Sequence, residues 1–97
     1  MKVFISGPMT GKEDFNRAAF NDAALEIIRK GHIALNPAVL PDGLLHREYM
    51  QICIAMLKIA DAIYQLPGWE TSEGANIEYD YAIITDLKIF RPEVANE

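Results

Sequence analysis

The chain has 97 residues, a length that holds one hydrophobic core and excludes a second, so we expect a single domain over residues 1–97. Hydrophobic residues make up 51% and charged residues 24% of the chain, which is ordinary globular usage and excludes disordered, collagen-like and coiled-coil chains. The 14 acidic residues outnumber the 9 basic ones, giving a net charge of −5. With no run of Lys or Arg to follow a phosphate backbone, duplex nucleic acid is not expected as a partner.

Membrane and metal partners are not expected either. No apolar stretch approaches the roughly 20 residues that cross a bilayer, and the apolar run at the start of the chain is too short for a signal-peptide core. We therefore expect a cytoplasmic protein. The single cysteine, Cys53, excludes an internal disulfide and a Cys-rich zinc site, and His32 and His46 are too few for a metal cluster. Neither a metal nor a cofactor is predicted.

Strand patterns and helix patterns alternate along the chain. The strand patterns are short apolar runs that end at turn residues, and they cover residues 2–6, 32–36, 61–66 and 88–90. The helix patterns carry apolar residues at spacings of three and four, and they cover residues 16–30, 46–59 and 72–86. For the last helix, Thr71 or Ser72 is the predicted N-cap.

This alternation predicts the fold. Strands and helices joined by short loops favour right-handed crossovers and a parallel sheet covered on both faces. We predict an α/β three-layer sandwich, flavodoxin- or Rossmann-like, with about four parallel strands in the order 2-1-3-4. The winding then reverses between the first and third strands, and ligands bind such sheets at that reversal. Residues 7–14 and 67–72 form the two loops expected to meet there.

The first of these loops contains Gly7 and Gly11, followed by Lys12. Its likeness to a Walker A loop is superficial, because that loop has four residues between its glycines and a Ser or Thr after the lysine. Here three residues separate the glycines and Glu13 follows the lysine, so ATP hydrolysis is not supported. A glycine-rich turn between a strand and a helix can bring N–H groups to a phosphate, or it can be a tight turn without a ligand.

Glu78 stands out because helical spacing points it inward. It lies three residues after Ala75 and four before Ala82, within the apolar side of the last predicted helix. An unpaired carboxylate there costs several kcal/mol unless it is solvated in a cleft or hydrogen-bonded. Glu78 is therefore either a catalytic nucleophile or base, or a residue paired with a basic group at the helix edge.

Other chemistry-bearing residues allow two interpretations. Trp69 could stack on a planar ligand or cap the core. Asp61 fits a structural role where a helix gives way to a strand, while His32 and His46 have no partner pattern and are expected at the surface or in turns. Cys53 falls within a helical apolar stripe and has no activating partner, which favours a packed residue over a nucleophile.

Taken together, three motifs resemble a small bacterial and phage family of unknown function over nearly the whole chain. They are Phe4-Ile5-Ser6-Gly7-Pro8-Met9-Thr10-Gly11, Asn36-Pro37, and Leu66-Pro67-Gly68-Trp69-Glu70 followed by Ser72-Glu73-Gly74-Ala75 and Glu78. That family is similar in turn to the nucleoside 2-deoxyribosyltransferases and the 2'-deoxynucleoside 5'-phosphate N-hydrolases. The likeness to these enzymes rests on the glycine turn and on Ser-x-Gly-x-x-x-Glu, here Ser72, Gly74 and Glu78.

The resemblance implies a function and a site. In those enzymes the matching glutamate attacks the anomeric carbon of a 2-deoxyribosyl group and expels the base, which makes Glu78 the expected catalytic residue for a deoxynucleoside or its 5'-monophosphate. The residues expected to bind this substrate are Phe4, Ser6, Gly7, Pro8, Met9, Gly11, Trp69, Ser72, Gly74 and Ala75. Because the relatives complete their sites with a neighbouring subunit, a homodimer or higher homo-oligomer is implied.

Two departures from the enzymes keep other functions open. They generally carry a tyrosine where Phe4 stands, and often an aspartate where Cys53 stands, so a hydroxyl and a carboxylate are missing. Losing a polar group that contacts the transition state can slow a reaction by two or three orders of magnitude. The alternatives are a non-catalytic module that sequesters or senses a nucleotide, and an interaction protein with a vestigial site.

Overall fold

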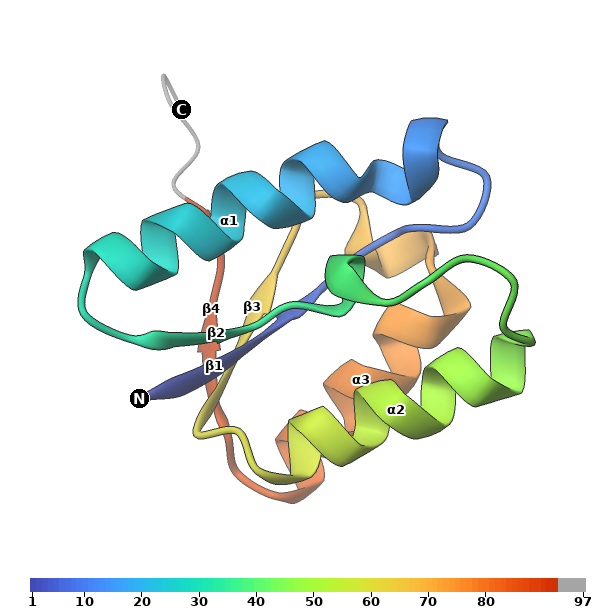
Figure 1. Ribbon diagram of the computed structural model, residues 1–97. Helices are drawn as coiled ribbons and strands as arrows, with labels where there is room; N and C mark the ends of the chain where they lie inside the picture. The colour runs from blue at the N-terminus through green and yellow to red at the C-terminus, as the bar shows by residue number, and fades with distance from the viewer. Residues whose placement is uncertain (93–97) are drawn as a thin grey trace.

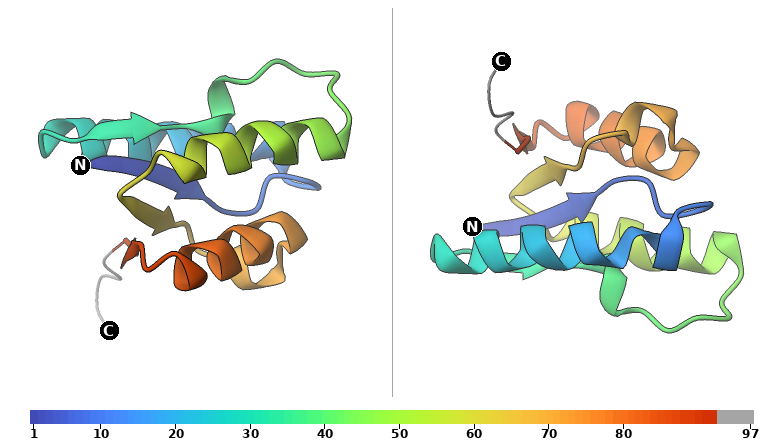
Figure 2. Two further views of the ribbon diagram at one scale, coloured as in Figure 1. Left: turned by 90° about the horizontal axis from the view of Figure 1, so that it is seen from below. Right: turned by 90° about the horizontal axis from the view of Figure 1, so that it is seen from above.

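The computed structural model describes residues 1–92 and shows a parallel sheet between two layers of helices (Figure 1). The sheet order is β2-β1-β3-β4. Its strands are β1 (Lys2–Ser6), β2 (Ile33–Leu35), β3 (Ala62–Gln65) and β4 (Lys88–Phe90). Helix α1 (Arg17–Arg29) covers one face, and α2 (His46–Lys58) and α3 (Glu73–Ile84) cover the other (Figures 1 and 2). The predicted fold class and strand order are confirmed.

The central strand pair positions the site. β1 pairs in parallel with β3 from Val3 opposite Ala62 to Ser6 opposite Gln65, and on its other side with β2. The sheet therefore reverses its winding between β1 and β3, as predicted. The loops after these two strands leave the same edge of the sheet, where α3 also begins.

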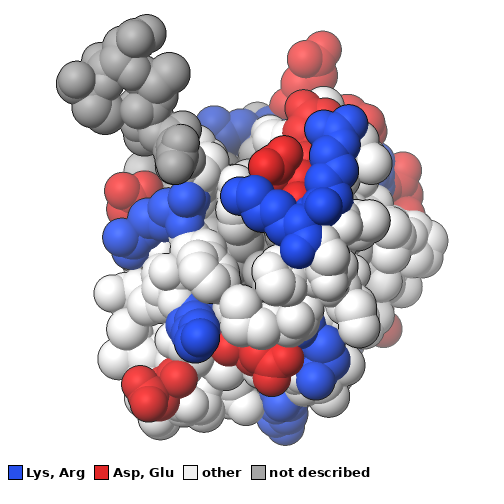
Figure 3. Space-filling model, turned by 90° about the vertical axis from the view of Figure 1, so that its left-hand side faces the viewer, with Lys and Arg blue, Asp and Glu red and all other residues white. Residues whose placement is uncertain are grey.

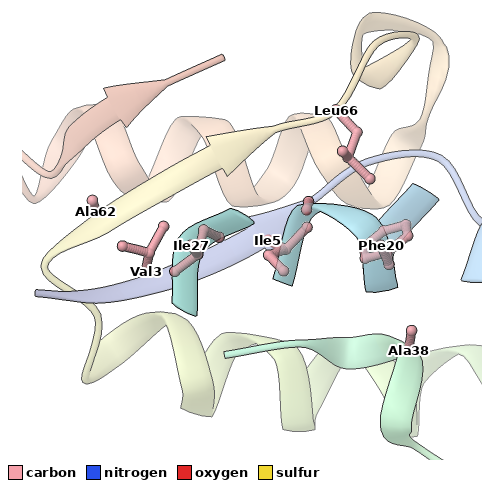
Figure 4. Packing of buried hydrophobic residues seen from close by; sticks show 8 residues of the cluster. Val3, Ile5, Phe20, Ile27, Ala38, Ala62 and Leu66 are labelled. Carbon is pink, nitrogen blue, oxygen red and sulfur yellow. The ribbon is translucent and has the colours of Figure 1, made fainter. Parts of the chain in front are cut away.

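Alternation along β1 divides the core into two clusters, because successive side chains of a strand point to opposite faces. Val3 and Ile5 face α1, where they pack with Phe20 and Ile27 (Figure 4). Phe4 faces the other layer, in a cluster whose buried members also include Cys53, Leu57, Ala60, Ile63 and Ala82. Ser6 continues the Phe4 side of the strand and so points toward α2 and α3.

The predicted element ends are one or two residues too long in most cases, and three short 3-10 helices were not predicted. They span Glu13–Asn16, Pro37–Val39 and Trp69–Thr71. The first contains three consecutive residues with positive φ, of 47° to 62°. The Asn16 side chain holds this stretch by donating a hydrogen bond to the Pro8 carbonyl at 2.9 Å. Tertiary contacts of this kind override local backbone preference and leave no periodic sequence signal.

Asp61 has the structural role that its position favoured. Its Oδ2 accepts a hydrogen bond from the Lys2 backbone N–H at 2.8 Å and lies 3.6 Å from the Lys2 ammonium. This contact connects the turn before β3 to the start of β1. The hydrogen bond from Lys2 lowers the pKa of the Asp61 carboxyl.

Charged side chains of both signs are interspersed on the side of the molecule drawn in Figure 3. None of the helices within residues 1–92 is long and apolar enough to cross a membrane. In the same residues, no group of three or more His, Cys, Asp and Glu side chains is arranged to hold a metal ion.

The turn after β1 requires glycine at position 7. A Cβ at Gly7 would lie 2.8 Å from the Cβ of Leu66, a buried core residue. We expect Gly7→Ala to lower the free energy of unfolding by about 1–3 kcal/mol, as overpacking does elsewhere. Urea unfolding followed by circular dichroism measures this loss.

Gly74→Ala is the matched control for that measurement. Its Cβ would meet the Sδ of Met50 at 3.1 Å and its Cε at 3.9 Å, and a methionine side chain can shift. Alanine is also preferred over glycine in a helix by about 1 kcal/mol, so the variant should be close to wild type in stability. Equal destabilisation by the two substitutions would contradict the assigned contact with Leu66.

Candidate active site

A cavity of about 570 Å³ opens at the carboxyl edge of the sheet, where the winding reverses. Its walls come from the loop after β1, the start of α1, the inner side of α2 and the first two turns of α3. Pockets that bind small molecules measure roughly 300–1,000 Å³, so a ligand of nucleoside size fits this space.

Glu78 is the cavity's buried acid. It lies on α3 and is only 6% exposed, yet it lines the cavity. The Ser6 hydroxyl donates a hydrogen bond of 2.6 Å to Glu78 Oε1, and Ser6 itself is 1% exposed. Within the described residues, neither carboxylate oxygen is in an ion pair with a basic side chain. The interpretation of Glu78 as half of a helix-edge ion pair is therefore not what the structure shows.

Burial changes the acidity of this carboxyl. It raises the pKa of Glu78 from 4.5 to about 7, although the hydrogen bonds from Ser6 and from the Cys53 thiol lower it. Near neutral pH the group therefore exchanges between its neutral and ionised forms. A carboxylate with few hydrogen bonds to water is also a better nucleophile than a fully solvated one.

Cys53 contributes packing to this site. It lies on α2, lines the cavity beside Glu78 and is 7% exposed. Burial and the neighbouring Glu78 charge raise the pKa of the Cys53 thiol to about 12. Because the thiolate is the reactive form, this cysteine is not a nucleophile near neutral pH.

The start of α3 forms another wall. The Ser72 hydroxyl caps the helix by accepting a hydrogen bond from the Ala75 N–H at 3.2 Å, which confirms the predicted N-cap. The N–H groups of Glu73 and Gly74 have no intrahelical acceptor, because the first turn of a helix offers none. Both residues line the cavity, so the positive end of the helix dipole is directed at it.

Arg17 lines the cavity and pairs with two carboxylates, those of Asp14 and Asp42. Arg17 Nη1 donates to Asp14 Oδ1 at 2.7 Å, and its Nη2 donates to Asp42. Asp14 belongs to the loop after β1 and Asp42 to the loop before α2, so Arg17 joins the two loops beside the cavity. Tyr49 fixes the second loop by donating its hydroxyl to the Pro41 carbonyl at 2.6 Å.

The structure brings most of the predicted site residues together. Those that line the cavity are Gly7, Pro8, Met9, Ser72, Gly74, Ala75 and Glu78. Ser6 lies behind Glu78 and contacts it directly. Phe4 is completely buried in the core, and Gly11 lies in a turn outside the lining, with a φ of 80°.

Trp69 also lies outside the cavity lining. It packs on Tyr79 with ring centroids 4.7 Å apart, and the Arg91 guanidinium lies 5.6 Å from its ring centre. The aromatic ring thus contacts Tyr79 and Arg91. These contacts fit the packing interpretation of Trp69, and its role in binding a substrate stays a prediction.

Sequence patterns did not indicate Arg17, Asp42 or Tyr49 as parts of the site. Arg17 and Asp42 come from separate segments 25 residues apart, and a contact of that separation has no local signature. Tyr49 occupies an apolar position of the helix predicted over residues 46–59, and Asp42 lies in a Pro-Asp-Gly sequence typical of a turn. Neither pattern indicates a contact at the cavity.

A family model described as a domain of unknown function, DUF4406, matches residues 1–91. The chain belongs to the DUF4406 family. This match covers nearly the whole chain. It confirms the resemblance to a small family of unknown function that the motifs predicted. No protein with a curated description matches this DUF4406 member.

Among solved structures, the DUF4406 chain is similar to a 2-desoxiribosyltransferase from Leishmania mexicana. The two share 20% sequence identity and superpose with a TM-score of 0.73, over 93% of this chain. The match spans 62% of the Leishmania protein, less than two thirds of its length. The likeness shows that this DUF4406 domain has the same fold, and it confirms the resemblance that the motifs predicted.

Proposed function

We propose that this protein cleaves or transfers the N-glycosidic bond of a 2'-deoxynucleoside or its 5'-monophosphate, with Glu78 as the nucleophile. The observation that carries the proposal is a buried carboxylate, held by a 2.6 Å hydrogen bond from Ser6, in the wall of a nucleoside-sized cavity. The shared fold with a deoxyribosyltransferase supports the same reaction class.

The chemistry follows from the Glu78 carboxylate. Ser6 holds its Oε1, and Oε2 is the oxygen expected to attack the anomeric carbon as the carbon–nitrogen bond breaks and its electron pair leaves with the base. The transition state resembles an oxocarbenium ion, which the carboxylate stabilises by its charge before forming an ester. Water or a second base then attacks the same carbon, and the ester's carbon–oxygen bond breaks and returns its electron pair to Glu78. The proton lost by the attacking water or base goes to the base that left.

Ser6 supplies a hydroxyl that Phe4 lacks. Both residues lie on the same face of β1, two positions apart, but only Ser6 reaches the carboxylate. We infer that Ser6 is a positioning residue that orients Glu78 and stabilises its ionised form. The departure from the enzymes at position 4 therefore does not leave the nucleophile without a hydroxyl partner.

Ser6→Ala tests that role. Because the Ser6 hydrogen bond lowers the pKa of Glu78, its removal should raise that pKa further and shift the acid limb of the activity profile to higher pH. Base release at pH 7 should fall about tenfold, and the loss should shrink as the pH rises toward 9. The measurement is initial rate against pH for both proteins. An equal loss at every pH would indicate a packing defect and contradict the positioning role.

A non-catalytic nucleotide-binding module is the second candidate. It is favoured by Cys53, an un-ionised thiol beside Glu78 where the characterised enzymes often have a carboxylate. Such a protein would bind the same ligands in the cavity without breaking their N-glycosidic bond.

Chromatography of deoxynucleosides and their 5'-monophosphates after incubation with the protein separates these functions. Release of base without an added acceptor identifies a hydrolase, and exchange only with a second base identifies a transferase. Intact ligand combined with a rise in unfolding temperature identifies the binding module. Intact ligand with no such rise contradicts both candidates. A thermal shift is preferable to tryptophan quenching, since Trp69 lies outside the cavity lining.

A further inference from the structure

An exposed aromatic ring belongs to the wall of the cavity that contains Glu78. Of the large apolar side chains that are exposed within residues 1–92, Phe15 alone lines this cavity, and it is 46% exposed. Ile5 and Phe20 line the cavity too, but both are buried members of the core. An aromatic ring that stays in contact with water inside a cavity is free to stack on a planar ligand.

The backbone that carries this ring is strained. Phe15 has a φ of 54°, and its neighbours Asp14 and Asn16 have φ values of 47° and 62°. Bulky residues rarely adopt this left-handed region, and such conformations cluster at ligand sites, where the surrounding contacts enforce them. The hydrogen bond from Asn16 to the Pro8 carbonyl enforces this one. Core packing does not explain the strain, because the 3-10 helix that contains Phe15 has no buried residue.

Arg17 fixes the ring at the cavity. Its guanidinium lies 5.2 Å from the centre of the Phe15 ring, which is a cation–π contact, and Arg17 itself lines the cavity. The guanidinium is held in turn by Asp14 and Asp42. The ring is therefore in place before a ligand arrives, so stacking on it costs little conformational entropy.

The positions of Phe15 and Glu78 match the geometry of a displacement. The attacking and leaving groups occupy opposite sides of the carbon at which the displacement occurs. Glu78 reaches the cavity from α3, whereas Phe15 lies just before α1, and these two helices lie on opposite faces of the sheet (Figure 2). With Glu78 at the sugar carbon, the base leaves toward the wall that carries Phe15.

We propose that Phe15 stacks on the nucleobase of the substrate and supplies the affinity for that base. This inference rests on the proposed function, because it places the sugar carbon at Glu78. Every nucleobase has a π face, so stacking on Phe15 favours ligands with a base over ligands without one. Phe15 thus fills the stacking role that the sequence alone left open for Trp69, which lies outside the cavity lining.

Affinities of Phe15→Leu test the proposal by isothermal titration calorimetry, with Glu78→Gln present in every protein so that the ligands stay intact. The probes are the common 2'-deoxynucleoside 5'-monophosphates, and 2-deoxyribose 5-phosphate, which lacks the base. Phe15→Leu should weaken binding of the deoxynucleotides about tenfold and binding of 2-deoxyribose 5-phosphate less than about twofold. The matched control is Phe90→Leu, which changes a phenylalanine that is 40% exposed outside the cavity lining and should alter neither affinity.

Three results would overturn the stacking role. The first is equal weakening of the two kinds of ligand, which would indicate a general packing defect. The second is an unchanged affinity for the deoxynucleotides, and the third is a protein with Phe15 intact that binds none of them. Phe15 is outside the core, so Phe15→Leu is expected to fold, and circular dichroism checks this.

Phe15→Trp adds a spectroscopic readout. Combined with Trp69→Phe, which keeps an aromatic ring beside Tyr79, it makes the introduced indole the sole tryptophan of the chain. The fluorescence of this indole should fall when a deoxynucleotide binds and stay unchanged when 2-deoxyribose 5-phosphate binds. The affinity for deoxynucleotides should remain within about threefold of that of the protein with Phe15. Unchanged fluorescence at saturating deoxynucleotide would overturn the proposal.

These results are independent of whether the N-glycosidic bond is broken. A base-dependent effect of Phe15→Leu in a protein whose wild type releases no base supports stacking and contradicts the reaction. Release of base by the wild type, together with no base-dependent effect of Phe15→Leu, contradicts stacking and leaves the reaction standing.

Discussion

Replacing Glu78 by glutamine is expected to reduce base release from a deoxynucleoside substrate by at least roughly a thousandfold, because an amide cannot form the glycosyl ester. The fold should remain intact. The glutamine oxygen can still accept the Ser6 hydrogen bond, and the change in volume is small. Single-turnover rates with a saturating substrate separate the lost chemistry from any change in affinity.

The control for this variant is Glu70→Gln. Glu70 is an exposed carboxylate on the 3-10 helix that precedes α3, and it is not part of the cavity wall. Its replacement should leave the rate within about twofold, as surface substitutions do. Activity of Glu78→Gln equal to that of Glu70→Gln would remove Glu78 from the reaction. Circular dichroism of both variants shows whether a lost rate reflects a lost fold.

The second large effect is on stability against pH. In the unfolded chain Glu78 ionises with a pKa of 4.5, whereas in the folded protein burial raises the pKa to about 7. Below pH 4.5 the carboxyl is protonated in both the folded and the unfolded state, so it does not make the free energy of unfolding depend on pH. Between pH 4.5 and 7 only the unfolded state has released the proton, so the free energy of unfolding falls as the pH rises. Above pH 7 the loss is complete, at about 3 kcal/mol.

Glu78→Gln abolishes this dependence, since glutamine does not titrate. Relative to wild type, the variant should gain about 3 kcal/mol of stability between pH 4 and pH 8. Urea unfolding of both proteins at several pH values measures the difference between their free energies of unfolding. The contributions of the other titrating groups cancel in this difference. Asp61 is one such group, and its lowered pKa acts in the opposite direction. A difference that does not change with pH would mean that Glu78 is not buried in an unfavourable environment.

Sequence periodicity predicted the fold and one central residue of the site. Alternating strand and helix patterns favoured a parallel sheet with crossovers, for which 2-1-3-4 is the most economical strand order. Glu78 was recognised because a charged residue at inward helical spacing conflicts with simple packing. Both signals are local or regular, and so they can be read along a single chain.

Contacts between distant segments could not be predicted in this way. The Ser6 hydroxyl and the Glu78 carboxylate are 72 residues apart in the chain. They meet because Ser6 points to the face of the sheet on which α3 packs. The contact of Arg17 with Asp42 joins segments 25 residues apart, and three residues with positive φ come just before Arg17 in the chain. Trp69 had two equally good sequence interpretations, and its contact with Tyr79 is visible only in the three-dimensional structure.

The separation between Ser6 and Glu78 also has a consequence for biosynthesis. As the chain leaves the ribosome, β1 and α1 emerge long before α3, and the central strand must wait for β3 before it is paired on both sides. Contacts of such long range close late and slow the folding of a small domain. A nascent chain that ends before α3 would contain most of the apolar residues that pack with α1, but it would lack Glu78. Formation of the carboxylate–hydroxyl contact therefore requires that synthesis has passed α3.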